Sequence, residues 1–335
     1  MTGNAPNLRS NWLSRFFIGL AVVAIVIAAA GVAYQTIAST RDRRSYPMPG
    51  QLVDIGGYKL HIDCTGVGSP AVILDSGLGD GYTSWRKVQP QISQFSRVCS
   101  YDRAGYGYSD SSFRARTSRV FAEELHALLH CAGVSPPYVL VGHSMGGLDV
   151  RIYAGLYPSD IAGMVLVDSS HPDQKKRFPP ALNDMEGTWL REQEFLTLIM
   201  PFGIPRLMGF CAKDVDVRAA DCNFHSQREA LAELKSFNES ANQASTTGSL
   251  GAIPLAVLSS DPNRPEPDLP EDLVAPMNNT WQQMQEELAQ LSTKSTHVIA
   301  RNSGHYIQLD RPDIVVNAVD QMVSQIRKSP QHEAY

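Results

Sequence analysis

The sequence lacks an excess of positive charge, an internal repeat, and a cysteine spacing that is typical of a metal site. It has 29 Lys and Arg against 34 Asp and Glu, which gives a formal net charge of -5. A protein that holds nucleic acid by its phosphates needs a basic surface, so nucleic acid is excluded as a partner. The five cysteines form no Cys-x-x-Cys pair, and such pairs are the usual signature of structural zinc. We therefore expect neither a metal nor another cofactor.

The sequence also has little charge, and this places it among folded proteins. Charged residues make up 19% of the 335 residues and hydrophobic residues 43%, which excludes a disordered chain. About 290 residues remain outside the apolar N-terminal stretch described next, and this length suits one large α/β domain with an inserted subdomain.

The long uncharged run of the chain is FFIGLAVVAIVIAAAGVAY at residues 16–34. As a helix it would be about 28 Å long, close to the ~30 Å hydrocarbon core of a bilayer. Trp12 and Tyr34 stand where aromatic residues of the membrane interface are found. We predict a single-pass transmembrane helix over 16–34, preceded by a tail at 1–15 and followed by a polar linker at 35–49.

A cleaved signal peptide is the alternative for this segment. Residues 28–30 and 31–33 both have the small side chains of a cleavage site, whereas the length of the apolar run favours an uncleaved anchor. An N-terminal signal anchor most often leaves the bulk of the chain outside the cytoplasm. We therefore expect a membrane protein whose folded domain is extracytoplasmic.

Downstream of the linker, short apolar runs alternate with helical patterns. Strands are predicted at 51–55, 58–63, 71–74, 97–101, 138–141, 163–168, 254–258 and 296–300. This alternation predicts a mostly parallel sheet with helices on both faces. Residues 171–252 have no clear strand and contain a cluster of apolar side chains, so we interpret them as a helical cap inserted after the sixth strand. The core then comprises 50–170 and 253–328, with a tail at 329–335.

The turn GHSMGG at residues 142–147 stands between a predicted strand and a predicted helix. In a Gly-x-Ser-x-Gly turn the serine is held in a strained backbone conformation that lifts its hydroxyl above the sheet. Glycine at 142 and 146 lets the strand and the helix pass close to each other. The helix N-terminus offers N–H groups to a developing oxyanion. These features predict that Ser144 is the nucleophile of an enzyme.

A glycine-rich loop, DSGLGDG at residues 75–81, follows an earlier predicted strand. It lacks the Gly-Lys-Ser/Thr ending and the Gly-x-Gly-x-x-Gly spacing of nucleotide-binding loops. We interpret it as the second half of an oxyanion hole. Gly77 lets the backbone approach the substrate, and the N–H groups of Leu78 and Met145 are the expected donors.

These motifs together resemble the α/β-hydrolase superfamily, specifically its lipase-like and esterase-like members. The landmarks are SGLG at 76–79, YDRAGYGYS at 101–109, VGHSMGG at 141–147 and SGH at 303–305. The resemblance covers roughly residues 50–328. It implies an eight-stranded sheet with an antiparallel second strand, and a catalytic triad in the chain order Ser, acid, His. Many relatives carry His-Gly in the oxyanion loop, and Ser76 takes the place of that histidine here.

The resemblance places the catalytic base at His305, in the loop after the last predicted strand. A serine hydroxyl needs such a base, and an acid must hold the imidazole tautomer. Asp168, at the end of the sixth strand, is the favoured acid. Asp261 follows the seventh strand, the commoner position, but comes about two residues early and precedes a proline-rich segment. Asp173 is a third option.

The apolar side chains of the predicted cap have two interpretations. They pack on the core, or they line an acyl pocket, for which Phe202 and Met208 are our candidates.

The cysteines also have two interpretations. Cys64 and Cys99 fall on strands that neighbour each other in the resembling fold, and Cys211 and Cys222 lie in the cap. Each pair could form a disulfide outside the cytoplasm, and buried free thiols are the alternative.

The function predicted from these residues is that of a membrane-anchored serine hydrolase. Its substrate would be a small ester or lipid with an apolar acyl chain, cleaved through an acyl-enzyme. A thioesterase, an amidase or an acyltransferase would use the same residues. A non-catalytic binding protein on a hydrolase scaffold usually lacks the serine or the histidine, and both are present. Epoxide hydrolysis and dehalogenation need an aspartate at position 144.

Overall fold

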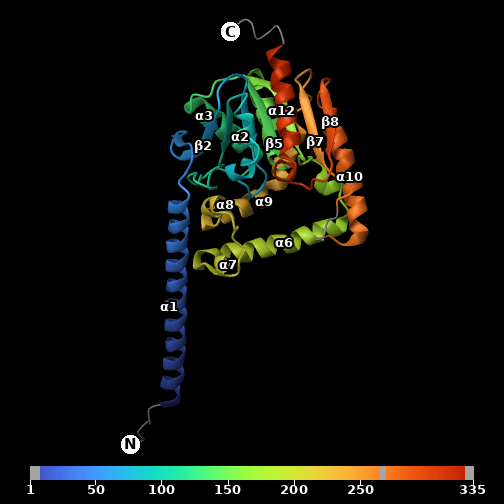
Figure 1. Ribbon diagram of the computed structural model, residues 1–335. Coiled ribbons are helices and arrows are strands. Elements are labelled where there is room, and N and C mark those ends of the chain that lie inside the picture. The colour runs from blue at the N-terminus through green and yellow to red at the C-terminus, as the bar shows by residue number, and fades with distance from the viewer. Residues whose placement is uncertain (1–7, 265–268, 329–335) are drawn as a thin grey trace, which may run out of the picture.

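The computed structural model describes residues 8–264 and 269–328 (Figure 1). Residues 1–7 and the predicted tail at 329–335 lie outside this description. The strands are β1 (Gln51–Asp54), β2 (Lys59–Thr65), β3 (Ala71–Asp75), β4 (Val98–Tyr101), β5 (Tyr138–His143), β6 (Ile161–Val167), β7 (Leu255–Ser260) and β8 (Ser295–Ala300).

The eight strands form one sheet in the order β1-β2-β4-β3-β5-β6-β7-β8. β2 pairs antiparallel with both β1 and β4, and the other pairs are parallel. The predicted α/β-hydrolase fold, with its antiparallel second strand, is thereby confirmed.

The central strands are buried on both faces because helices cover both. In β3, Val72 and Leu74 belong to one cluster of buried side chains and Ile73 to the other. Burial on both faces explains why these strands appear in the sequence as continuous apolar runs instead of alternating patterns.

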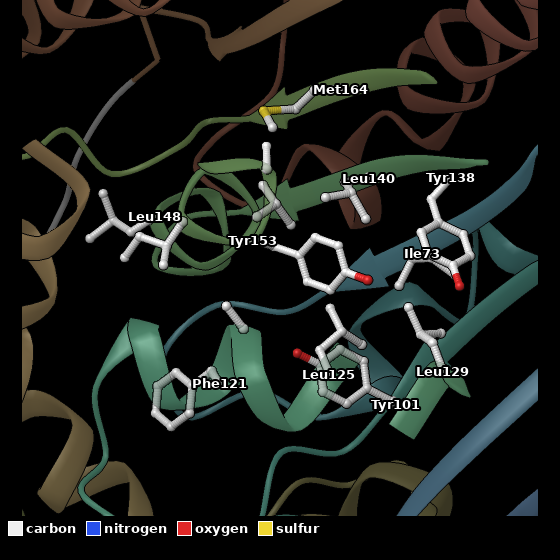
Figure 2. Close-up of a cluster of buried hydrophobic side chains, with 14 of the residues drawn as sticks. Ile73, Tyr101, Phe121, Leu125, Leu129, Tyr138, Leu140, Leu148, Tyr153 and Met164 are labelled. Carbon is white, nitrogen blue, oxygen red and sulfur yellow. The ribbon is translucent and has the colours of Figure 1, made fainter. Parts of the chain in front are cut away.

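The core helices are α2 (Gln89–Ile92), α3 (Ser118–Cys131), α4 (Gly146–Leu156), α10 (Glu271–Ala289), α11 (Ile307–Asp310) and α12 (Pro312–Arg327), with the 3-10 helices η1 (Tyr82–Trp85) and η2 (Pro158–Asp160). Figure 2 shows the cluster on one face, where Phe121 and Leu125 of α3 lie with Tyr153 of α4 and Leu140 of β5. α2 and α12 cover the other face, where Val319 is fully buried. Each such side chain contributes about 1.5–3 kcal/mol by leaving water, so the two clusters fix the sheet between its helices.

Between β6 and β7 the described chain forms helices. They are α5 (Gln174–Arg177), α6 (Pro180–Ile199), η3 (Met200–Phe202), α7 (Ile204–Leu207), α8 (Val215–Asp221) and α9 (Phe224–Ser245). We call residues 171–252 the cap. α9 joins the cap to the core, because Phe237, Ala241 and Ala244 in its second half belong to the core cluster.

The N-terminal segment is one continuous helix of 38 residues, α1 (Leu8–Ser45). Its part Trp12–Ser45 is long and apolar enough to cross a membrane. Residues 8–15 of the predicted tail are helical as well. The predicted linker at 35–49 is wrong for residues 35–45, which continue the helix because one side of this stretch packs on the cap.

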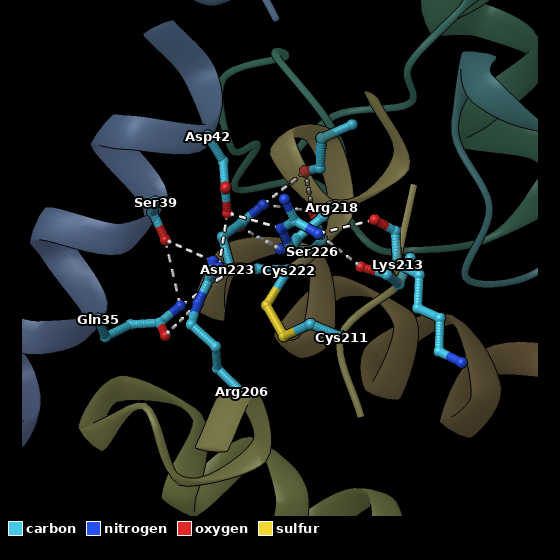
Figure 3. Close-up of a disulfide and its surroundings, with 12 residues drawn as sticks. Gln35, Ser39, Asp42, Arg206, Cys211, Lys213, Arg218, Cys222, Asn223 and Ser226 are labelled. Atoms are coloured by element: carbon cyan, nitrogen blue, oxygen red, sulfur yellow. Dashed lines mark hydrogen bonds and ion pairs between the residues drawn. A yellow bond between two sulfur atoms is a disulfide. The ribbon is translucent and has the colours of Figure 1, made fainter. Parts of the chain in front are cut away.

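The contacts between α1 and the cap are polar and converge near a disulfide (Figure 3). Asp42 Oδ2 lies 2.5 Å from Arg206 Nη1 and 3.2 Å from Arg218 Nε. Gln35 Nε2 donates to the carbonyl oxygen of Cys222 at 3.0 Å. We call these contacts the clamp, and they fix α1 against α7 and α8.

Both cysteine pairs are disulfides in the structure, and not free thiols. Cys64 of β2 and Cys99 of β4 stand directly opposite each other and are bonded. Cys211 and Cys222 are bonded within the cap, beside the clamp. The disulfides thus tie an antiparallel strand to the parallel sheet and join the two ends of the segment that contains α8.

Candidate active site

Ser144 occupies the turn between β5 and α4 in a strained conformation. Its φ is 51°, a value that residues with a side chain rarely adopt. The turn has no room for a larger residue at 142, because a Cβ there would lie 2.5 Å from the carbonyl oxygen of Gly146. The Ser144 N–H donates to the carbonyl oxygen of Val167 at 3.1 Å. The neighbouring strand and the close approach of α4 therefore hold the serine at the end of β5.

His305 and Asp168 form a hydrogen-bonded pair. Nδ1 of His305 lies 2.7 Å from Oδ2 of Asp168, and the aspartate is buried at the end of β6 with a φ of 41°. Its other oxygen, Oδ1, accepts from the Ser260 N–H at 2.8 Å and from the indole Nε1 of Trp281 at 2.9 Å. The carboxylate is thus held at both oxygens. Nothing in the sequence pointed to Trp281, which lies on α10.

The other two candidate acids are bonded elsewhere. Asp261 Oδ2 accepts from the Asn302 N–H at 2.9 Å, and its Oδ1 accepts from the Asn263 N–H at 3.1 Å. These backbone hydrogen bonds lower the pKa of Asp261. Asp173 pairs with Lys176 at 2.9 Å on the surface. The structure therefore brings Asp168 to His305, while Asp261 braces the turn that leads to His305.

His143, the residue before the serine, points its ring toward the His305 loop. Its Nε2 donates to the carbonyl oxygen of His305 at 3.0 Å, since a carbonyl can only accept. Burial keeps the pKa of His143 well below its usual range, so the ring is neutral.

The oxyanion loop after β3 is held by Arg103, which is buried. Its guanidinium donates to the carbonyl oxygens of Ser76 at 2.7 Å and Gly77 at 2.6 Å. The same group pairs with Asp75 at 2.9 Å and with Glu233 of α9 at 3.0 Å. Because Arg103 occupies these carbonyls, the following N–H groups of the loop are turned away from it.

The expected oxyanion donors are the N–H groups of Leu78 and Met145, and the loop that carries Leu78 packs against the serine turn. A Cβ on Gly77 would come within 3.2 Å of the Ser144 Cβ, which brings the loop with Leu78 against the turn. Met145 immediately precedes α4. Among the residues that the structure describes, the N–H groups of Leu78 and Met145 form no hydrogen bond with a backbone carbonyl outside helices and strands.

A cavity of about 410 Å³ contains these groups, and both Ser144 and His305 line it. Its apolar walls come from the cap, with Phe178, Leu182, Trp189, Leu234 and Phe237.

The two predicted substrate-contacting residues are not part of this wall. The backbone of Phe202 packs against Gly31 of α1, and Met208 is exposed at the end of α7. The prediction that they contact substrate differs from the structure because the apolar side chains of the cap are divided between the cavity, α1 and the surface. Within the described residues, no group of three or more His, Cys, Asp or Glu side chains is arranged to hold a metal ion.

Two acidic side chains line the same cavity, Glu186 of the cap and Asp80 of the core. Asp80 lies in the oxyanion loop, and its Oδ2 is buried. Burial raises the pKa of Asp80 to about 6, although the positive charge of Arg103 works against this shift. This carboxyl group therefore changes charge in the mildly acidic range, close to where a substrate oxyanion would form.

Comparison with known sequences points to one fold. The family model described as alpha/beta hydrolase fold matches residues 70–216. The chain is 28% identical over 249 residues to the uncharacterized protein YqjL of Bacillus subtilis, which covers 74% of this chain and 81% of that protein. It is 24% identical over 292 residues to an AB hydrolase superfamily protein of Gibberella zeae, covering 77% and 87%. Other relatives are longer, and the chain covers 49% of YbdG of Bacillus subtilis.

Solved structures agree with this result. The epoxide hydrolase CorEH has a TM-score of 0.62 at 17% identity, over 82% of this chain and 98% of that chain. A thermophilic esterase from Thermogutta terrifontis has a TM-score of 0.58 at 23% identity, over 80% and 94%. At these identities the likeness concerns the fold alone, because one fold hosts many reactions.

Proposed function

Because this chain belongs to the α/β-hydrolase superfamily, we propose that it is a membrane-anchored serine hydrolase that cleaves carboxylic esters. The observation that carries the proposal is the 2.7 Å pair of Asp168 and His305 in the wall of a cavity that also contains Ser144. An aspartate at Nδ1 leaves Nε2 of the imidazole as the basic nitrogen. Position 144 holds a serine, so the covalent intermediate is an acyl ester of the serine and not an ester of an aspartate.

In the first step, Ser144 Oγ attacks the ester carbonyl carbon while His305 accepts the hydroxyl proton. The carbonyl oxygen becomes an oxyanion, and the N–H groups of Met145 and Leu78 stabilise it. The bond between the former carbonyl carbon and the alcohol oxygen of the ester then breaks, and the leaving alcohol takes the proton from His305. The product of this step is an acyl-enzyme on Ser144.

In the second step, water attacks the acyl-enzyme and His305 accepts its proton. The new oxyanion collapses, the bond to Ser144 breaks, and the serine recovers the proton from His305. A carboxylic acid is released. Asp168 holds the imidazole in place and stabilises the imidazolium of both steps.

The apolar wall of the cavity supports a substrate with a hydrocarbon acyl chain. The packing of α1 on the cap through residues 31–43 supports an anchor that is retained and not cleaved. The two disulfides support a location of the domain outside the cytoplasm.

The test is hydrolysis of p-nitrophenyl esters from acetate to palmitate by the full chain in detergent micelles. Ser144→Ala is the control, and a fluorophosphonate probe reports the reactivity of the serine. We expect turnover and labelling that both disappear in the variant. Labelling without turnover would favour the thioesterase, amidase or acyltransferase alternative. A folded protein that is not labelled would overturn the proposal and favour a binding protein on a hydrolase scaffold.

A further inference from the structure

The cap exposes a group of large apolar side chains next to the membrane helix. We call this group the membrane-facing patch. It consists of Phe195, Leu198, Ile204, Leu207, Met208 and Phe210. Leu198 and Leu207 are exposed by 68% and 70%, and Phe210 by 63%. An exposed apolar surface of this kind marks a contact with another apolar phase.

The patch lies on the side of the domain from which α1 extends. In Figure 1, α6 and α7 form the edge of the folded domain, and α1 passes beside α7 and continues beyond it. The residues of the patch come from the last part of α6, from α7 and from the three residues that follow α7. They are therefore grouped beside the anchor.

Contacts between α1 and the cap set the depth of the patch relative to the bilayer. A Cβ on Gly31 would lie 2.6 Å from the carbonyl oxygen of Phe202, and a Cβ on Gly203 would lie 2.7 Å from the Tyr34 ring. Gly31 and Tyr34 stand in the last turn of the apolar run 16–34, which spans about 28 Å and thus the hydrocarbon core. η3 and α7 therefore lie at the boundary between hydrocarbon and headgroups.

Behind the patch the cap contains a second cavity of about 420 Å³. At one end it is lined by Phe210, which is also part of the patch. At the other end it shares Leu78, Trp189 and Leu234 with the cavity that contains Ser144. The two cavities are thus neighbours, and the second one extends from the oxyanion loop to the patch.

The walls of the second cavity suit a hydrocarbon chain. Aliphatic and aromatic side chains make up most of the lining, and Asp221 is its one ionisable group among the described residues. Burial holds the pKa of Asp221 well above its usual value, which favours the uncharged form of this carboxyl. A mostly apolar channel of this kind has few polar groups that an alkyl chain would leave unpaired.

We propose that the membrane-facing patch rests in the boundary layer of the bilayer that α1 crosses, and that the second cavity takes up the hydrocarbon chain of a membrane-resident lipid ester. The docking of the patch stands on the geometry of α1 and the cap. The passage of the chain toward Ser144 rests on the proposed function. Amphipathic surfaces of soluble domains contact bilayers in this manner, with apolar side chains below the headgroups.

Depth-dependent quenching tests the docking without reference to catalysis. The test uses the full chain with Cys131→Ser and one added cysteine, which is Leu207→Cys in the patch or Val67→Cys at an exposed control position. An environment-sensitive fluorophore is attached to the added cysteine in the absence of reductant. Val67 precedes β3, at the end of the strands opposite the cap. In phosphatidylcholine vesicles we expect spin-labelled lipid to quench the probe at 207 several-fold more than at 67. Equal quenching overturns the docking. If the probe at 207 is shielded from an aqueous quencher but is not quenched by spin-labelled lipid, the docking is also overturned, and a protein partner is indicated instead.

Chain-length dependence tests the route to the serine. Ala230→Phe places a ring in the second cavity, and Ala230 lines that cavity only. We expect the preferred ester to become shorter, with the ratio of palmitate to butyrate turnover lowered at least ~10-fold. Leu198→Asp with Leu207→Asp should lower the ratio of vesicle-borne to micellar long-chain ester turnover by a similar factor. Unchanged ratios would overturn the proposed path of the hydrocarbon chain through the second cavity. A wild-type chain without any esterase activity would instead refute the proposed function and leave the quenching result valid.

Discussion

The ring of His143 and the main chain of His305 are joined by a hydrogen bond of 3.0 Å between Nε2 and the carbonyl oxygen. Two residues 162 positions apart in the sequence are thus coupled directly, one beside the proposed nucleophile and the other the proposed base. Since the His143 ring is neutral and buried, this bond positions the His305 loop without adding charge to the site.

Replacement of His143 should lower the rate of the chemical step. His143→Ala removes the donor to the His305 carbonyl, so we expect kcat to fall about tenfold, the factor that corresponds to one hydrogen bond, with little change in KM. His143→Gln retains a donor and should recover part of the loss. The measurement is kcat and KM for a soluble ester. A change confined to KM would contradict a positioning role.

The choice of the acid can be tested with two amide variants. Asp168→Asn should lower kcat by about 10³–10⁴-fold, because the amide stabilises the wrong imidazole tautomer and no imidazolium. Asp261→Asn should change kcat only a few-fold and instead lower the thermal midpoint, because the amide oxygen can accept from only one of the two backbone N–H groups, those of Asn302 and Asn263. The reverse ranking in kcat would make Asp261 the acid.

Arg103 is expected to matter for stability as well as activity. Arg103→Met removes the arginine that pairs with Asp75 and Glu233 in the interior, and loss of one member of a buried ion pair costs about 3–5 kcal/mol. Arg103→Lys keeps the charge, but its three N–H donors cannot replace the contacts of Arg103 with two loop carbonyls and two carboxylates, so we expect a smaller loss of stability with a clear loss of kcat. Thermal unfolding and ester turnover of the lysine variant measure the two effects separately. A lysine variant with full activity would show that the carbonyl contacts do not shape the oxyanion loop.

The stability of the protein should depend on pH through Asp80. The pKa of Asp80 in the folded protein is raised to about 6, above its value in the unfolded chain. The contribution of this carboxyl to the free energy of unfolding is therefore fully present below about pH 4 and is lost as the pH rises through 6. Asp80→Asn stays neutral, and we expect it to gain on the order of 2 kcal/mol relative to the wild type between pH 4 and pH 7.5. Unfolding midpoints at both pH values give the comparison. A difference that does not vary with pH would refute this assignment.

The clamp should contribute more than an ordinary surface ion pair. Asp42→Asn removes the charge that holds Arg206 and Arg218, with an expected cost of about 2 kcal/mol. Asp214→Asn is a matched control, because its pair with Arg86 is 3.4 Å long and largely exposed and should be worth well under 1 kcal/mol. Thermal unfolding of the full chain measures both. Equal effects would mean that the clamp is dispensable.

The fold could be predicted from sequence because its central strands are buried on both faces. The run 138–141, for example, is apolar throughout and corresponds to β5, which ends two residues later at His143. The serine turn could be located because its glycines are required by contacts within the same turn, such as that between Gly142 and Gly146. Local patterns were sufficient in both cases.

The rest depends on contacts between distant segments. Residues 35–45 contain polar side chains such as Gln35 and Asp42, which suggested a linker, and their partners Arg206 and Cys222 lie more than 160 residues away. The sequence left the choice between Asp168 and Asp261 open, because strand ends alone do not say which carboxylate meets His305. Trp281 bonds Asp168 from a helix 113 residues further on, and no motif surrounds it.

The clamp has a consequence for how the protein meets its substrate. A helix that continues rigidly out of the bilayer and is bonded to the cap does not allow the domain to tumble on a tether. Under the proposed docking, the end of the second cavity that Phe210 lines keeps one height and one direction relative to the plane of the lipids. The search for a lipid substrate would then be two-dimensional, and the rate of encounter would be set by the number of lipid molecules per unit area of membrane instead of by a concentration in solution.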